Sequence, residues 1–155
     1  MQGDPTKARP ILVVDDDADD RMMIEKALRK EGVENPIRFL GNGEELMDYL
    51  KRKGDFSKIE DLWPCFILLD LNMPRMDGRK ALLFIKADPE VKKIPVLVLS
   101  TSNAEEDIMR SYNLGANSFI RKPVNFEDLL AMARSLKNYW LKLVELPPGN
   151  SLAHP

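Results

Sequence analysis

The chain has 155 residues, of which 44% are hydrophobic and 31% are charged. That length and that balance are typical of one folded domain and exclude two full ones. The 23 basic and 25 acidic residues leave a net charge of -2, which argues against a nucleic-acid partner or attachment to a membrane surface.

The hydrophobic pattern predicts an alternation of short apolar strands and amphipathic helices along the chain. We expect strands over 11–14, 37–40, 66–69, 96–99 and 117–120. We expect helices over 18–31, around 46–50 with an end near Gly54, around 81–85 with an end at Asp88, over 104–113, and over 126–144 after an Asn125 N-cap. Continuous apolarity indicates strands that are buried on both faces.

Strand followed by helix, five times over, predicts an α/β fold with a parallel sheet between two layers of helices. We expect the doubly wound, flavodoxin-like (βα)5 topology with strand order 2-1-3-4-5. A single domain should span residues 10–146, with flexible tails over 1–9 and 147–155. No apolar run approaches the roughly 20 residues that cross a bilayer, so we expect no membrane segment. The N-terminus has no apolar stretch of a secretory signal, and with a single cysteine in the chain we expect a cytoplasmic protein.

One cysteine and one histidine narrow the possible chemistry. Cys65 alone can form neither an intrachain disulfide nor a thiolate zinc site. His154 stands next to the last residue, which argues against a Ser-His-Asp triad, a Cys-His dyad or an HExxH zinc site. Any chemistry must therefore come from carboxylates, hydroxyls and lysines.

Polar side chains follow four of the five expected strands, at the point where each apolar run ends. They are Asp15-Asp16-Asp17, Asp70, Ser100-Thr101 and Lys122. In the strand order 2-1-3-4-5 these groups converge on one crevice at the carboxyl ends of the strands. Clustered carboxylates repel one another unless a cation neutralises them, and shallow oxygen sites suit Mg²⁺. A cation, a hydroxyl and a lysine around a carboxylate make a site for a phosphoryl group.

Four stretches resemble the receiver domain of two-component response regulators. They are Ile11–Asp17, Leu68–Gly78, Val98–Thr101 and Arg121–Pro123, and the resemblance extends over residues 10–144. The polar insertion over 55–64, the stretch 100–107 and the ending 139–147 are similar to those of the stand-alone response regulators of bacterial and cyanobacterial phytochromes.

The resemblance implies a phosphoacceptor and a Mg²⁺ site. Asp70 would accept the phosphoryl group. Asp16 would bind the metal directly and Asp15 directly or through water, while Asp70 and the backbone carbonyl of Asn72 would complete the ligands.

The resemblance also implies a conformational switch. Lys122 would pair with Asp70 or with a phosphoryl oxygen, and Ser100, with Thr101 beside it, would swing toward that group. The Lys122–Pro123 peptide would be cis. Phe119 stands where many relatives have tyrosine, so the phenol hydrogen bond is missing from this position.

The implied function is a phosphorelay switch that takes its phosphoryl group from a phosphohistidine of a sensor histidine kinase, with a phytochrome-type photoreceptor as a candidate. We expect no enzymatic activity beyond self-catalysed phosphotransfer and autodephosphorylation. The chain ends soon after the last helix, so output is expected through protein contacts or onward phosphotransfer. A homodimer through 104–113, 117–120 and the last helix is the expected assembly.

An enzyme remains the alternative. Asp15-x-Asp17 partly fits the first motif of small Mg²⁺-dependent phosphohydrolases that use an aspartate nucleophile, here Asp15. In that case Asp19 stands where threonine or valine is expected, and Asp70 has no role. A flavodoxin-like cofactor module is excluded because acidic residues 15–20 would repel a cofactor phosphate.

Overall fold

The core of the structure is a five-stranded parallel sheet in the order β2-β1-β3-β4-β5. The structure, a computed structural model, describes residues 5–72 and 78–148. The strands are β1 (Ile11–Val14), β2 (Ile37–Leu40), β3 (Phe66–Asp70), β4 (Val96–Ser100) and β5 (Ser118–Arg121). The predicted doubly wound topology is confirmed, and β3, β4 and β5 each reach one residue further than the sequence pattern suggested.

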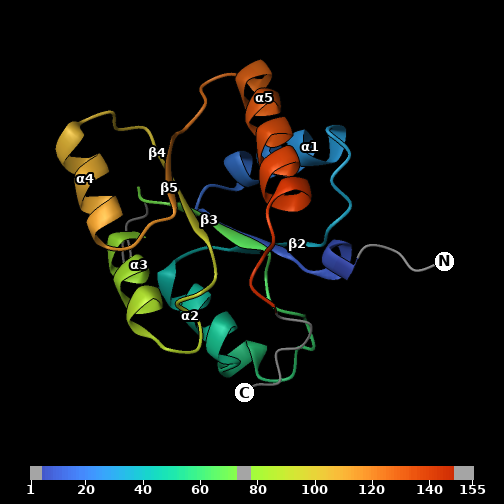
Figure 1. Cartoon of the computed structure of the whole chain (residues 1–155), viewed down its shortest axis with the longest axis vertical. Helices are drawn as coiled ribbons and strands as arrows, with labels where there is room; N and C mark the ends of the chain where they lie inside the picture. The colour runs from blue at the N-terminus through green and yellow to red at the C-terminus, as the bar shows by residue number, and fades with distance from the viewer. Residues whose placement is uncertain (1–4, 73–77, 149–155) are drawn as a thin grey trace.

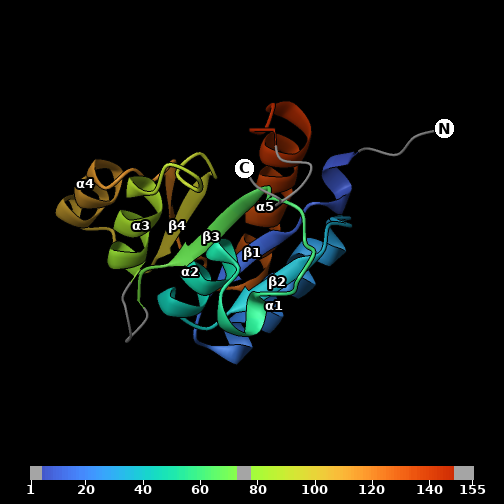
Figure 2. The ribbon, with the colours of Figure 1, turned by 90° about the horizontal axis from the view of Figure 1, so that it is seen from below.

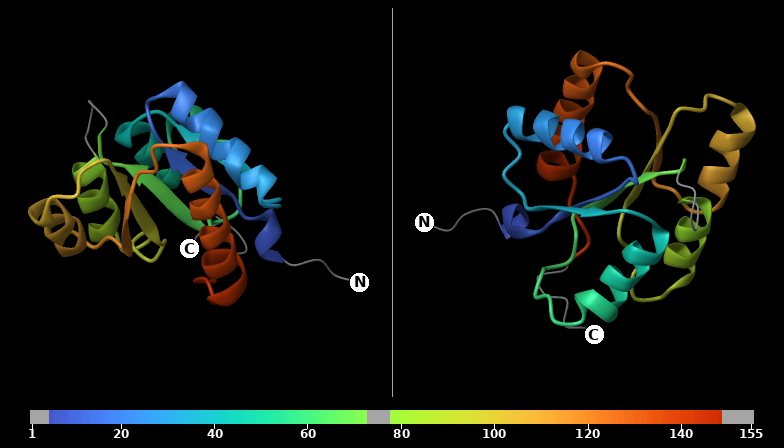
Figure 3. Two further views of the ribbon diagram at one scale, coloured as in Figure 1. Left: turned by 90° about the horizontal axis from the view of Figure 1, so that it is seen from above. Right: turned by 180° about the vertical axis from the view of Figure 1, so that it is seen from behind.

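Helices cover both faces of the sheet. They are α1 (Ala18–Lys30), α2 (Gly43–Lys51), α3 (Gly78–Ala87), α4 (Glu105–Asn113) and α5 (Phe126–Leu136), with short 3₁₀ turns η1 (Pro5–Ala8) and η2 (Gly54–Phe56). Figures 1 and 3 show α1 beside α5 on one face and α2 beside α3 on the other. Figure 2 shows α4 next to α3 at the β5 end of the sheet.

Alternation along the strands separates two apolar clusters. Leu12 and Val14 of β1 pack with α2 and α3, whereas Ile11 and Val13 pack with α1 and α5. Successive strand side chains point to opposite faces, so a strand covered on both faces must be apolar throughout. The three central strands β1, β3 and β4 are therefore buried along their whole length, up to the residues where they end.

Local side-chain chemistry sets where the helices begin. The Asp17 carboxylate accepts from the amides of Asp19 and Asp20 at the start of α1, and Asn125 caps α5 as predicted. Gly78 opens α3 so close to β3 that a Cβ there would lie 2.8 Å from the carbonyl oxygen of Asp70. Only glycine permits this approach, which brings the start of α3 against the end of β3.

The segment before β1 differs from the predicted flexible tail over 1–9. Residues 5–8 form η1, and Arg9 is buried with its guanidinium donating to the carbonyls of Trp63 (2.9 Å) and Pro64 (3.0 Å). The Asn35 amide donates to the carbonyls of Thr6 and Arg9. These hydrogen bonds order residues 5–9, while 1–4 and 149–155 of the predicted tails lie outside the described residues.

The last helix also differs from the single helix predicted over 126–144. After α5 the chain continues as a π-helical segment, η3 (Lys137–Leu143), in which the amide of Val144 donates to the carbonyl of Tyr139 five residues earlier. Trp140 packs there against Phe66 of β3 and against Tyr139. Within 5–72 and 78–148, none of the helices has both the length and the apolar character for a bilayer crossing.

Candidate functional site

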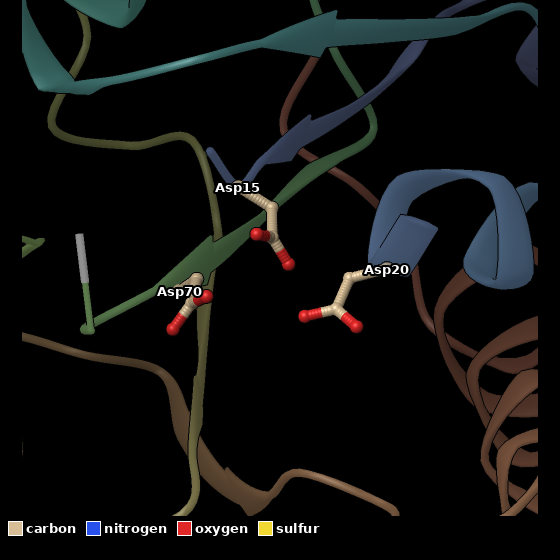
Figure 4. A group of neighbouring side chains, drawn as sticks. All are labelled: Asp15, Asp20 and Asp70. Carbon is tan, nitrogen blue, oxygen red and sulfur yellow. The ribbon is translucent and has the colours of Figure 1, made fainter. Parts of the chain in front are cut away.

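Three carboxylates converge at the carboxyl ends of the central strands. One oxygen from each of Asp15, Asp20 and Asp70 lies within 4.8 Å of the others. β1 and β3 are neighbours with Val14 opposite Leu69, so the residues that follow, Asp15 and Asp70, are brought side by side. Figure 4 shows the three side chains directed toward a common space, Asp20 from α1 and the other two from the strand ends.

Lys122 lies among these carboxylates, just after β5. Its ammonium donates to Asp20 at 2.7 Å, to Asp70 at 3.0 Å and to Asp15 at 3.1 Å. Burial alone would lower the pKa of Lys122, but the hydrogen bonds to Asp20 and Asp70 and the nearby carboxylate charges raise it above its ordinary value. The lysine is therefore a permanent positive charge at the centre of the site.

The two buried carboxylates are held in the same way. Oδ1 of Asp15 accepts from the amide of Asp17, and Oδ1 of Asp70 accepts from the amide of Asn72, each at 2.9 Å. In both residues Oδ2 faces Lys122. Burial raises the pKa of Asp15, against the opposing influence of the Asp17 amide and Lys122. Backbone and lysine together fix the direction in which each carboxylate points.

Asp20 is the member of this group that the strand-end pattern does not predict, because it lies in the first turn of α1. Asp17 as N-cap indicates that Asp20 lies in the first turn of a helix that begins directly beyond the end of β1, but no local pattern indicates its contact with Lys122. Asp16, the expected direct metal ligand, is exposed and is not one of the three converging carboxylates. Its role as a ligand stays a prediction.

The expected switch hydroxyls lie at and just after the end of β4, which pairs with β3 on the side away from β1. Ser100 is buried at the end of β4, and its Oγ accepts from the amide of Ser102 at 3.1 Å. Thr101 Oγ1 accepts from the Asn72 side-chain amide at 3.2 Å, which ties this loop to the segment after β3. The backbone amide of Lys122 donates to the carbonyl of Ser100, so the lysine and the serine are carried by paired strands.

Phe119 is half-buried and packs against the core cluster that contains α2 and α3. Its backbone amide donates to the phenol oxygen of Tyr112 on α4 at 3.1 Å. A phenol is therefore hydrogen-bonded next to Phe119, but it belongs to Tyr112 of α4 and it contacts the backbone of β5.

The peptide bond between Lys122 and Pro123 is trans, and the expectation of a cis bond is wrong. The trans isomer is the intrinsically preferred one even before proline. Lys122 reaches all three carboxylates with it, so the observed site does not require the cis form.

The donor set fits a hard divalent cation. Asp15, Asp20 and Asp70 offer carboxylate oxygens only, and such ligands suit Mg²⁺ or Mn²⁺ better than softer metals. A buried carboxylate beside an ammonium, a hydroxyl and metal-binding oxygens is also the arrangement that phosphoryl transfer uses.

Comparison with known proteins identifies relatives along nearly the whole chain. Residues 11–134 match the family described as the response regulator receiver domain. Response regulator Rcp1 of Synechocystis sp. (strain ATCC 27184 / PCC 6803 / Kazusa) is 35% identical over 147 residues, which cover 95% of this chain and 99% of that protein.

Two solved structures are also similar to this chain in three dimensions. The crystal structure of Mn²⁺-bound Rcp1 has a TM-score of 0.81 and 36% identity, and covers 90% of this chain and 99% of that one. The phosphorylated cyanobacterial phytochrome response regulator RcpA has a TM-score of 0.83 and 38% identity, and covers 91% and 99%. The predicted resemblance to phytochrome response regulators is confirmed.

Proposed function

The chain belongs to the response regulator receiver family, and from that premise we propose that Asp70 is its phosphoacceptor. The observation that carries the proposal is the convergence of Asp15, Asp20 and Lys122 on Asp70 at the end of β3. Asp70 is 3% exposed, and its Oδ1 is held by the Asn72 amide, so the carboxylate is fixed for attack.

The reaction transfers a phosphoryl group from a histidine of a partner kinase. A carboxylate oxygen of Asp70 forms the new O–P bond as the N–P bond of the phosphohistidine breaks, and the imidazole leaves with the electron pair of that bond. Mg²⁺, when bound, supplies positive charge that offsets repulsion between the carboxylates and the incoming group. Asp15 and Asp70, with Asp16 and the Asn72 carbonyl, are the proposed ligands.

Lys122 neutralises charge on the phosphoryl oxygens. Its ammonium already lies 3.0 Å from Asp70, so a modest movement brings it to a group attached there. Ser100, next to Thr101 on the neighbouring strand, supplies the hydroxyl that turns toward the phosphoryl group. Phe119 follows on β5, where it is half-buried and can repack when Ser100 moves.

A sensor histidine kinase is the proposed donor, and a phytochrome-type kinase is the proposed specific partner. RcpA, which covers 91% of the chain at 38% identity, is a phytochrome response regulator. We propose no enzymatic activity for the chain beyond its own phosphotransfer and autodephosphorylation.

The proposed output surface is the α4–β5–α5 face, through which two copies would pair. A groove of about 910 Å³ runs along β5 and α5 and is lined in part by Ile120, Met132, Tyr139 and Trp140. On α4, Met109 is 61% exposed and Tyr112 is 48% exposed. Apolar surface of this extent favours an isologous contact between identical faces.

Intact mass after incubation with Mg²⁺ and acetyl phosphate tests the assignment. The wild-type protein and Asp15→Asn are compared with Asp70→Asn. We expect the wild type to gain one phosphoryl group, EDTA to prevent the gain, and Asp70→Asn never to show it. A phosphoryl group on Asp15, which peptide mass analysis would locate, would support the phosphohydrolase alternative instead.

A further inference from the structure

A chain of hydrogen bonds connects the switch serine to two helices. The amide of Ser102 donates to Ser100 Oγ at 3.1 Å. The hydroxyl of Ser102 donates to Asp107 Oδ2 in the first turn of α4 at 2.6 Å, and Arg79 in the first turn of α3 donates to Asp107 Oδ1 at 3.1 Å. We refer to Ser102, Asp107 and Arg79 as the β4–α4 latch.

Asp107 is the residue that joins the two other members of the latch, and its side chain is restrained by both. Its carboxylate has a donor on each oxygen, and the hydrogen bond from Ser102 together with the charge of Arg79 holds the pKa of Asp107 below its ordinary value. The Asp107 side chain is 25% exposed and that of Arg79 is 31% exposed. Among the described residues Arg79 Nε is buried without a hydrogen-bond partner, so Arg79 is held through its terminal nitrogen.

We propose that Asp107 is a positioning residue that holds Ser100 in its unphosphorylated orientation through Ser102. This inference rests on the proposed function, in which Ser100 turns toward a phosphoryl group on Asp70. Turning Ser100 toward Asp70 moves its Oγ, so the hydrogen bond from the Ser102 amide survives only if the loop that carries this amide moves with it. The loop that carries this amide cannot follow while Asp107 holds the Ser102 hydroxyl and Arg79 holds Asp107.

The latch therefore lies outside the phosphorylation site and opposes the change to the activated conformation. The hydroxyl of Ser102 also accepts from the amide of Ala104, so this one side chain contacts both Asp107 and the backbone at the start of α4. The Asn72 amide holds the same loop from the other side through Thr101. Loss of the latch lowers the cost of leaving the unphosphorylated conformation and thereby raises the apparent affinity for any ligand that selects the other conformation.

A simpler role for Asp107 is to complement the dipole of α4, since acidic residues favour the first turn of a helix. Glu106 lies in the same turn and is exposed, so Glu106→Gln removes the same charge without breaking the latch. It is the matched control for Asp107→Asn. Ser102→Ala is a second variant, which breaks the hydroxyl contact and leaves the Ser102 amide in place.

The test is calorimetric titration of the full chain with beryllofluoride in the presence of Mg²⁺. Asp107→Asn and Ser102→Ala should bind beryllofluoride about tenfold more tightly than the wild type, the size of one lost charge-assisted hydrogen bond in the resting state. Glu106→Gln should bind as the wild type does. Adding Arg79→Gln to Asp107→Asn should change nothing further, because both residues belong to one latch.

Equal or weaker binding by Asp107→Asn than by Glu106→Gln would overturn the inference. Hydrogen exchange without any ligand gives an independent readout: the Ser102 amide should exchange faster in Asp107→Asn than in Glu106→Gln, and equal exchange would contradict the latch. Failure of the wild type to bind beryllofluoride would instead refute the proposed function, and the inference with it.

Discussion

The ammonium of Lys122 lies 2.7 Å from Asp20 and 3.0 Å from Asp70, so one cation is shared between a helix residue and a strand-end residue. The Asp20 side chain is 42% exposed and that of Asp70 is 4% exposed. Asp20 therefore faces solvent while contributing negative charge to the buried group. This arrangement makes Asp20 part of the charge balance of the site.

Asp20→Asn should weaken Mg²⁺ binding by about tenfold, because it removes one of three converging carboxylate charges at short range. Calorimetric titration with Mg²⁺ measures the change. Asp19→Asn is the matched control, because Asp19 lies in the same turn of α1 and is exposed. Asp16→Ala should abolish binding if Asp16 is a direct ligand, and unchanged binding in that variant would exclude the ligand role.

Lys122→Met should lower the free energy of unfolding by about 2 kcal/mol without Mg²⁺, because it leaves the Asp15 and Asp70 carboxylates buried without their cation. Mg²⁺ should raise the melting temperature of this variant more than that of the wild type, since the added cation compensates the same charges. Thermal unfolding with and without Mg²⁺ measures both effects. An identical Mg²⁺ increment in the two proteins would show that the lysine and the metal do not share the carboxylates.

Asp61→Asn should cost about 1–2 kcal/mol of stability at pH 7. Asp61 accepts from Arg38 at 2.9 Å and from the Tyr49 hydroxyl at 2.6 Å, which joins the insertion before β3 to β2 and α2. Burial alone would raise the pKa of Asp61, but these hydrogen bonds and charges lower it.

A lowered folded-state pKa means that the ionised carboxylate stabilises the protein above its unfolded pKa, about 3.9, and that this contribution is lost as pH falls through the folded value. The deficit of Asp61→Asn should therefore shrink below about pH 4. Urea unfolding at a series of pH values measures it, with Asp55→Asn in the same insertion as an exposed control. A deficit that stays constant down to pH 2 would contradict the ionised contact.

Met109→Glu should impair pairing of two copies through the α4–β5–α5 face, because it places a charge on an exposed apolar position of α4. Sedimentation velocity at tens of micromolar, with and without beryllofluoride, measures the dimer fraction. Leu83→Glu on α3 is the control, since Leu83 is 48% exposed and lies outside the proposed face. A monomeric wild type in both states would leave this surface to a different protein.

The strand order and most of the site could be predicted because they follow from short-range patterns. Apolar runs that end on Asp15, Asp70, Ser100 and Lys122 locate the strand ends, and the topology then brings Asp15, Asp70 and Lys122 into contact. The contribution of Asp20 could not be predicted in the same way. Its contact with Lys122 joins residues 102 positions apart, and helix periodicity does not specify such a partner.

The segment before β1 shows the same limit. Its composition is that of a flexible tail, yet Arg9 is 7% exposed. The carbonyls that order it belong to Trp63 and Pro64, more than 50 residues away. A polar side chain can be buried when backbone carbonyls elsewhere in the chain accept its hydrogen bonds, and the local composition does not show whether they do.

The close approach of Gly78 to the backbone of Asp70 makes glycine the preferred residue at a helix position where alanine would ordinarily be favoured. Alanine is favoured over glycine within helices by about 1 kcal/mol, so a propensity scale would mark position 78 for improvement. Here the added methyl group would meet the carbonyl oxygen of Asp70 at 2.8 Å and the Cα of Leu71 at 2.9 Å. A substitution that raises the helix propensity of α3 would displace the very peptide that carries Asp70, so helix propensity and the packing of α3 against β3 make opposite demands on this residue.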